Sequence, residues 1–159
     1  MIRTTDVLDL ACLLEASPYM EQLEVHMWTS FDRARYHKHH GELRICPSQP
    51  HSNLKLVNMT GFYGQKDQIE LALHILKNAT VLEAMKIDPK PMVAAIYAYV
   101  NCKDGLCFVD GYKAAKKYLR KAYYRGVLDI VRVRRRDVEN VAVFKLVDPF
   151  WIALMAEDV

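Results

Sequence analysis

The sequence predicts an α/β fold in which helices pack on a small, mostly parallel sheet and the helix–strand units stack as a short solenoid. Segments with helical spacing of apolar residues alternate along the chain with segments that have strand spacing. Each unit has one apolar face, and only a neighbouring unit can cover it. Hydrophobic residues make up 52% of the 159 residues and charged residues 26%, which is typical of a single globular domain.

The first unit is a predicted helix over residues 5–16 followed by a short strand. Apolar residues recur at helical spacing in this helix: Val7, Leu10, Ala11 and Leu14. Thr5 is the expected N-cap, and Ser17-Pro18 ends the helix. Cys12 lies within the apolar pattern, so we expect it in the core. The strand is indicated by apolar residues that alternate with Glu24 and His26, namely Leu23, Val25 and Met27.

Residues 28–52 show no periodicity and are rich in polar residues, which predicts a long loop of about 20 residues or more. Long loops in compact domains are often functional. This loop holds several residues of the metal-binding type, namely His37, His39, His40, Cys46 and His51. Their spacing matches no closed zinc pattern, so we interpret them as parts of a polar loop and predict no metal site.

The next unit runs from a strand over residues 54–59 to the clearest helix of the sequence, over residues 66–79. Apolar residues stand in that helix at i, i+3, i+4 and i+7: Ile69, Ala72, Leu73 and Leu76. The "GFYG" run at 61–64 supplies glycines for a tight strand-to-helix turn and lacks the Lys-Ser/Thr of a phosphate-binding loop. A third strand is predicted over residues 84–87, ended by Asp88-Pro89.

The last predicted units contain two helices and one strand. Pro91 begins a helix, and residues 101–111 form a turn-rich link. A second helix covers residues 112–124, with Gly126 as its cap and a fourth strand over residues 127–133. The apolar side of this helix consists of Tyr112, Ala115, Leu119, Ala122 and Tyr123. Its basic side consists of Lys113, Lys117, Arg120 and Lys121.

Charge is unevenly distributed along the chain. Residues 111–136 contain ten Lys or Arg and one acid, Asp129, which gives +9. The formal net charge is +3, so the rest of the chain carries 3 − 9 = −6. We interpret the basic segment first as a solvated face. The functional alternatives are a contact for an acidic protein partner and nucleic-acid binding, and the "RVRRR" run at 132–136 also fits a nuclear import signal.

No pattern points to catalysis, a membrane or an oxidising compartment. The four cysteines are Cys12, Cys46, Cys102 and Cys107, and the last two do not form a C-x-x-C motif. Acidic residues interrupt the first apolar run, so we expect no secretory signal, free thiols and a soluble cytoplasmic or nuclear protein. No apolar run is long enough to span a bilayer. Without a catalytic motif, we predict neither enzymatic activity nor a cofactor.

Three stretches of the chain resemble parts of plant F-box proteins. Residues 13–28, "LLEASPYMEQLEVHMW", resemble a degenerate leucine-rich repeat. Residues 50–89, with the runs "LKLVNMTGFYG" and "NATVLEAMKID", look very like the FBD domain that follows such repeats. Residues 110–133 resemble the end of this region in grass proteins. Together the similarity covers most of residues 7–133 and implies a short leucine-rich-repeat-like solenoid.

The resemblance also implies an organisation for the chain. It suggests a degenerate repeat and long loop over 1–49, an FBD-like region over 50–136 and a divergent apolar tail over 137–159, all within one structural domain. In F-box proteins the F-box docks a Skp-type adaptor of a cullin ubiquitin ligase, and the repeat and FBD region holds the target. Here the repeat begins close to the first residue, so we expect the F-box to be absent.

The expected function is therefore that of a non-enzymatic protein-interaction module derived from an F-box protein. Such a module would sequester a target, relocate it or compete with full-length relatives. The alternatives are nucleic-acid binding through residues 113–136 and a substrate-recognition fragment of a ubiquitin-ligase subunit. With the first reading we expect a protein partner, no membrane and no nucleic acid.

The apolar tail is the predicted partner-binding surface. It gathers three large aromatic residues, Phe144, Phe150 and Trp151, and interface hot spots favour such side chains. Arg134, Arg135 and Arg136 precede them and would form a charged rim that speeds encounter with an acidic partner. Self-association through the tail is a second possibility. The equal structural alternative is that the tail caps the open end of the solenoid.

Overall fold

The structure, a computed structural model, describes residues 6–27, 35–47, 49–90, 106–120 and 126–134. Several predictions from the sequence lie outside these residues. They are the Thr5 cap, the helix that begins at Pro91 and the tail over residues 137–159.

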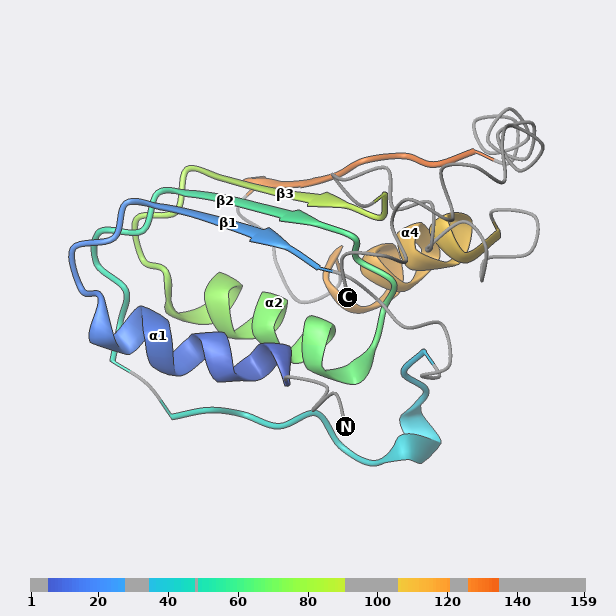
Figure 1. The fold of residues 1–159 in the computed structure, drawn as a ribbon, viewed down its shortest axis with the longest axis horizontal. Coiled ribbons are helices and arrows are strands. Elements are labelled where there is room, and N and C mark those ends of the chain that lie inside the picture. The colour runs from blue at the N-terminus through green and yellow to red at the C-terminus, as the bar shows by residue number, and fades with distance from the viewer. Residues whose placement is uncertain (1–5, 28–34, 48, 91–105, 121–125, 135–159) are drawn as a thin grey trace, which may run out of the picture.

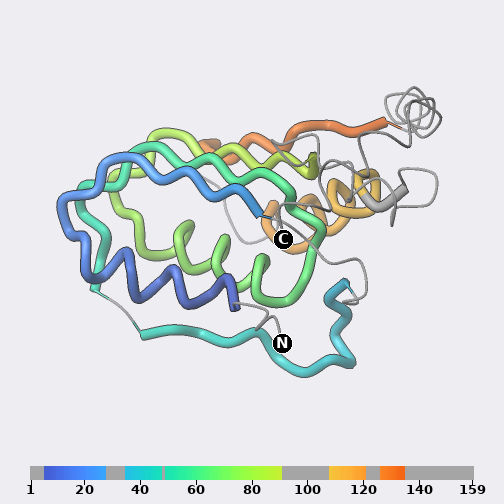
Figure 2. Tube along the Cα trace, viewed as in Figure 1, coloured from blue at the N-terminus to red at the C-terminus, as the bar shows by residue number. Residues whose placement is uncertain are grey.

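Four parallel strands form one sheet, and they lie in it in chain order (Figure 1). The strands are β1 (Gln22–His26), β2 (Leu56–Thr60), β3 (Ala84–Asp88) and β4 (Leu128–Ile130). Each chain crossing therefore brings the next strand beside the previous one, as in a solenoid (Figure 2). The predicted α/β class with a small parallel sheet is confirmed.

Apolar side chains from alternate positions of the strands form two rows across the sheet. One row joins Leu23, Val57, Met85 and Leu128, and the next joins Val25, Met59, Ile87 and Ile130. The members from β1, β2 and β3 are buried, because alternate side chains of a strand point to the same face. This alternation is the pattern that the sequence predicted for the first strand.

Two helices cover that apolar face. The short η1 (Val7–Asp9) leads into α1 (Leu10–Ala16), and α2 (Lys66–Asn78) follows β2. Both α1 and α2 lie on the same side of the sheet (Figure 1). The buried side of α2 includes Ile69, Ala72, Ile75 and Leu76, so the predicted helix of residues 66–79 is confirmed to within one residue.

The predicted burial of Cys12 is wrong. The buried residues of η1 and α1 are Leu8, Ala11 and Leu14, whereas Cys12 is exposed. Successive residues of a helix are rotated by about 100° about its axis, so a buried stripe that runs through Ala11 leaves Cys12 on the solvent side. The helix ends at Ala16, before the Ser17-Pro18 pair that was expected to end it.

The strand-to-helix turn at residues 61–64 is confirmed. Gly61 and Gly64 both have positive φ, of 74° and 90°. A Cβ atom on Gly61 would lie 2.1 Å from the carbonyl oxygen of Met27, so this glycine also allows the turn to touch the end of β1. The side chain of Gln68 closes the turn from α2, because its Oε1 accepts from the backbone N–H of Tyr63 and of Gly64.

The helix α4 (Leu106–Tyr118) begins six residues earlier than predicted, since residues 106–111 were assigned to a link. Gly111 was expected at the end of that link, but it lies inside the helix. Gly111 is buried, and a Cβ atom there would lie 2.3 Å from the carbonyl oxygen of Phe62. This glycine is therefore needed for close packing of α4 on the 61–64 turn and not for a bend in the chain.

The long loop after β1 is largely irregular where it is described, as predicted. Within residues 35–47 and 49–55 it contains one short 3₁₀ helix, η2 (Lys38–His40). Among the residues that the structure describes, no helix is long and apolar enough to cross a membrane.

Candidate functional site

Three basic residues on the exposed side of α4 and a fourth just beyond its end line a shallow hollow of about 460 Å³. These are Lys113, Lys116, Lys117 and Arg120, which we call the basic face. The opposite side of the helix buries Ala115, and Leu119 just beyond its end, against the core. Ala115 and Leu119 are four residues apart and hold one side of the helix against the core. The basic side chains on the other side therefore face solvent.

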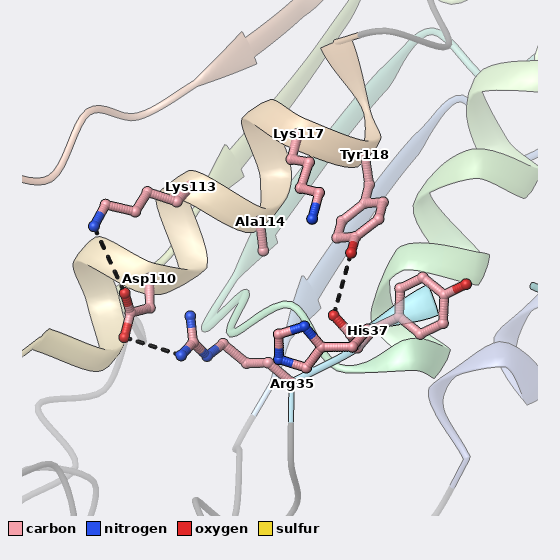
Figure 3. A pocket seen from close by; sticks show the side chains of 8 residues that line it. Arg35, His37, Asp110, Lys113, Ala114, Lys117 and Tyr118 are labelled. Carbon is pink, nitrogen blue, oxygen red and sulfur yellow. Dashed lines mark hydrogen bonds and ion pairs between the residues drawn. The ribbon is translucent and has the colours of Figure 1, made fainter. Parts of the chain in front are cut away.

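A second, smaller hollow of about 110 Å³ lies where the long loop meets α4. We call it the loop pocket. The loop contributes Arg35, Tyr36 and His37, and the helix contributes Asp110, Lys113, Ala114, Lys117 and Tyr118 (Figure 3). Lys113 and Lys117 belong to both hollows, so the basic face and the loop pocket form one continuous surface.

Tyr36 fixes the loop in place. Its backbone N–H donates to the carbonyl of Gly64 at 2.9 Å, just after β2, and its hydroxyl donates to the carbonyl of Gly41 at 2.9 Å. Tyr118 in turn donates from its hydroxyl to the carbonyl of Tyr36 at 3.3 Å, and the two rings have centroids 5.1 Å apart. Tyr36 is buried, so the loop is held on the body of the domain.

These contacts place the loop pocket beyond the carboxyl ends of β1 and β2. Gly64 and Phe62 follow β2 directly, and α4 packs on Phe62 through Gly111. Ligand sites in open α/β sheets commonly form outside the carboxyl ends of parallel strands, because connecting segments from neighbouring strands meet there. The location is therefore one where this type of fold can build a site.

Charge in the loop pocket is only partly neutralised. The carboxylate of Asp110 pairs with Arg35 at 3.2 Å and with Lys113 at 4.0 Å. Arg35 also lies over the ring of Tyr63, 5.7 Å from its centroid, and Lys117 lies 5.1 Å from the ring centroid of Tyr118. Cations over aromatic faces are attracted to the ring without losing their charge. One acid thus faces several cations.

His37 lies beside these cations and begins η2. Its backbone N–H donates to Nδ1 of His40 at 3.3 Å, and its own ring, when neutral, has one N–H donor and one acceptor nitrogen. Partial desolvation, and after it the positive charges of His39, His40, Arg35 and Lys117, lower the pKa of His37 below its ordinary value of 6.5. The field at the loop pocket is therefore positive.

The histidines and Cys46 of the loop do not come together as a metal site. The exposed rings of His37 and His39 stack, and the ring of His40 meets both edge-on, whereas His51 is buried against His74 on α2. Within the described parts of the chain, no group of three or more His, Cys, Asp or Glu side chains is arranged to hold a metal ion.

The face of the sheet opposite α1 and α2 carries polar side chains of both signs. Glu24, Asn58, Lys86 and Asp129 form one row across the four strands, at neighbouring register positions. The Oδ1 atom of Asn58 is buried and has no hydrogen-bond partner within the described residues. Opposite charges alternate along this row, so it lacks the single sign of the basic face.

The structure places part of the predicted site. Lys113, Lys117 and Arg120 share one exposed face, as predicted, and Lys116 joins them. Arg134 is exposed just beyond β4, while Lys121, Arg135, Arg136, Phe144, Phe150 and Trp151 lie outside the described residues. Sequence reasoning did not bring Arg35, His37 and Asp110 together in one pocket, because no local pattern links a loop after β1 to a helix more than 70 residues later.

Comparison with protein families shows which family the chain is similar to. A family model described as At1g61320/AtMIF1, LRR domain, matches residues 2–149. Comparisons with curated proteins and with solved structures gave no match.

Proposed function

Because the chain belongs to the At1g61320/AtMIF1 leucine-rich-repeat domain family, we propose that it is a non-enzymatic module that binds an acidic segment of a protein partner. Leucine-rich-repeat domains are generally protein-interaction modules. Their stacked units expose extended surfaces that are suited to binding other proteins. In this chain the proposed surface is the basic face of α4.

One observation carries the choice of surface. Among the residues that the structure describes, the hollow of the basic face is lined by Lys113, Lys116, Lys117 and Arg120 and by no acidic residue. A surface of one sign attracts a partner of the opposite sign, raises the association rate and disfavours partners of like charge. The four side chains lie on about two turns of helix, so they match a short acidic segment.

We also propose that this module derives from an F-box protein. The resemblance of residues 50–89 to the FBD domain supports descent from an F-box protein. On this view the module sequesters a target, relocates it or competes with full-length relatives for it. The alternative is that the chain is the substrate-recognition part of a cullin ubiquitin-ligase subunit. Binding of a Skp-type adaptor would favour that alternative, and measurable turnover of a substrate would contradict a non-enzymatic role.

Nucleic-acid binding is the second candidate function, and the basic segment of residues 111–136 favours it. One observation weighs against it: the family is one of leucine-rich-repeat domains, which are generally protein-interaction modules. Phosphate-driven affinity falls steeply with salt. Absence of binding to duplex and single-stranded RNA and DNA at about 50 mM salt would eliminate this candidate.

The direct test reverses charge on the basic face and compares two double variants. One is Lys116→Glu with Arg120→Glu, on the basic face outside the loop pocket. The control is Lys77→Glu with Lys86→Glu, which makes the same charge change at exposed positions on α2 and on the sheet. An acidic peptide of degenerate sequence, labelled for fluorescence anisotropy, is titrated with each protein.

We expect the Lys116/Arg120 variant to bind the acidic peptide at least about tenfold more weakly, a difference of about 1.4 kcal/mol. The control should bind the peptide within about threefold of the parent, since exposed charges far from the binding surface contribute little to affinity. Quantitative mass spectrometry of tissue proteins captured by the three forms then identifies partners lost with the basic face alone. Equal binding of the peptide by both variants would contradict the proposal.

A further inference from the structure

We propose that the loop pocket binds a phosphorylated side chain within the acidic segment of the protein partner. The inference rests on the proposed function and adds to it the chemistry of one residue of the partner. It adds Arg35 and His37, which lie outside the basic face, to Lys117, which belongs to both hollows.

Hydrogen-bond donors converge on the loop pocket from two elements. Arg35 and His37 come from the loop, and Lys117 comes from α4, with its ammonium group directed toward the His37 ring (Figure 3). Arg and Lys supply charged donors, and the neutral His37 ring supplies one N–H. Charge-assisted hydrogen bonds to an anion are about twice as strong as neutral ones.

Within the part of the chain that the structure describes, these donors are not all paired. Asp110 accepts from Arg35 at 3.2 Å and faces Lys113 at 4.0 Å, which leaves further N–H groups of the guanidinium. Within the described residues, neither Lys117 nor His37 pairs with a carboxylate. An incoming anion would therefore meet unneutralised charge where the cations crowd together.

Size and shape favour a phosphoryl group over a carboxylate. The volume of about 110 Å³ corresponds to roughly three or four water molecules at about 30 Å³ each, enough for a group of one phosphorus and three terminal oxygens. A phosphorylated side chain carries a charge of about −1.5 to −2 and three acceptor oxygens. A carboxylate carries −1 and two oxygens in one plane, which donors from two sides match less well.

The pocket is preorganised. Tyr36 and Tyr118 lock the loop to α4, and Arg35 is held between Asp110 and the ring of Tyr63. Donors that are already in place lose little conformational entropy when the ligand arrives, so more of the interaction energy appears as affinity.

The test uses the full chain and three degenerate acidic peptide pools that differ at one central position: serine, phosphoserine or glutamate. Binding is measured at about pH 7.5, above the second phosphate pKa of about 6, so that the phosphate is mostly a dianion. Phosphoserine should bind at least about tenfold more tightly than serine, and glutamate should recover less than half of that gain on a logarithmic scale.

Two single variants locate the effect. Lys117→Met keeps the apolar stem against Tyr118, and His37→Asn keeps an acceptor that can begin η2. Each should reduce the preference for phosphoserine to about threefold or less, with unchanged thermal unfolding. Lys116→Glu with Arg120→Glu should weaken all three pools by one factor and leave the phosphoserine preference intact.

The outcomes separate the two proposals. If the unmodified acidic pool binds through the basic face and phosphorylation changes affinity less than about threefold, this inference is wrong and the proposed function stands. If no pool binds, both are wrong. Displacement of the phosphopeptide by inorganic phosphate or by a single-stranded oligonucleotide at equal concentration would show a site for anions in general or for nucleic acid, and would overturn the inference.

Discussion

The Nε2 atoms of His51 and His74 lie 3.1 Å apart, and both side chains are buried where the long loop crosses α2. Two imidazole nitrogens at this distance share one hydrogen, because one nitrogen donates and the other accepts. Burial lowers the pKa of both histidines below 6.5; for His74 the neighbouring His51 adds to this, while Glu15 acts in the opposite direction. The pair is therefore stable as two neutral rings.

Stability should fall as the pH falls below about 6.5. The pKa of each histidine is lower in the folded state than its ordinary value of 6.5, so below pH 6.5 the unfolded chain binds more protons. The stabilisation that the two histidines contribute is complete above pH 6.5. It decreases as the pH falls toward the folded-state pKa, by at most about 1.4 kcal/mol per pH unit for each histidine. Urea unfolding at several pH values between about 5.5 and 7.5 measures it.

A double variant, His51→Asn with His74→Asn, should flatten this pH dependence, and the exposed control His39→Gln should retain it. A parent protein whose free energy of unfolding is the same at both ends of the range would show that the pair is not linked to folding.

Arg44→Ala should destabilise the domain by about 2–3 kcal/mol, the cost of leaving hydrogen bonds to a buried charge unmade. Arg44 donates from Nε to the fully buried carboxylate of Glu70 at 2.8 Å and from Nη1 to Asp6 at 2.7 Å. These bonds raise the pKa of Arg44 and tie the loop to α2 and η1. Chemical unfolding measures the loss.

The matched control for Arg44 is Lys55→Ala, which removes an exposed ion pair with Glu21. Exposed pairs are worth about 0–1 kcal/mol. Similar losses in the two variants would contradict a special role for the Arg44–Glu70 bond.

Gly61→Ala should cost more stability than Gly126→Ala. The two glycines have similar positive φ, 74° and 70°, so both substitutions impose the left-handed backbone penalty of roughly 1–2 kcal/mol. A Cβ on Gly61 would also lie 2.1 Å from the Met27 carbonyl oxygen, whereas no atom of the described residues lies within 4 Å of a Cβ on Gly126. We expect at least about 2 kcal/mol of additional loss at Gly61, in the range of overpacking. Equal unfolding midpoints would show that the turn shifts without cost.

Trp151→Ala combined with Phe150→Ala should weaken partner binding by about 2–4 kcal/mol if the tail is a hot spot. This prediction follows from the sequence alone, because both residues lie outside the described part of the chain. The measurement is a titration with a partner identified by the capture experiment. Thermal unfolding of the same variant is the control. A large drop in unfolding temperature would show that the tail is a structural cap, and unchanged binding would leave the basic face as the better candidate.

The sequence by itself determined the parallel sheet, α2 and the turn at residues 61–64. These features depend on local rules that operate over a few residues. Strand alternation sets which face of β1 is buried, apolar spacing sets the buried side of α2, and paired glycines allow the positive φ of the turn. The basic side of α4 could also be predicted from the sequence, because the same helical spacing separates Ala115 from Lys113 and Lys117.

Tertiary structure alone decided where that basic side meets another element. Tyr118 and Tyr36 are 82 residues apart, and the bond between them brings Arg35 and His37 beside Lys117. Packing also gave Gly111 a role inside α4, where the Phe62 carbonyl leaves no room for a side chain, although the sequence alone indicated a turn. Contacts of this kind depend on which helices, strands and loops pack against one another in the folded chain. Local residue preferences carry no information about such pairings, so the loop pocket could not be predicted before the fold was known.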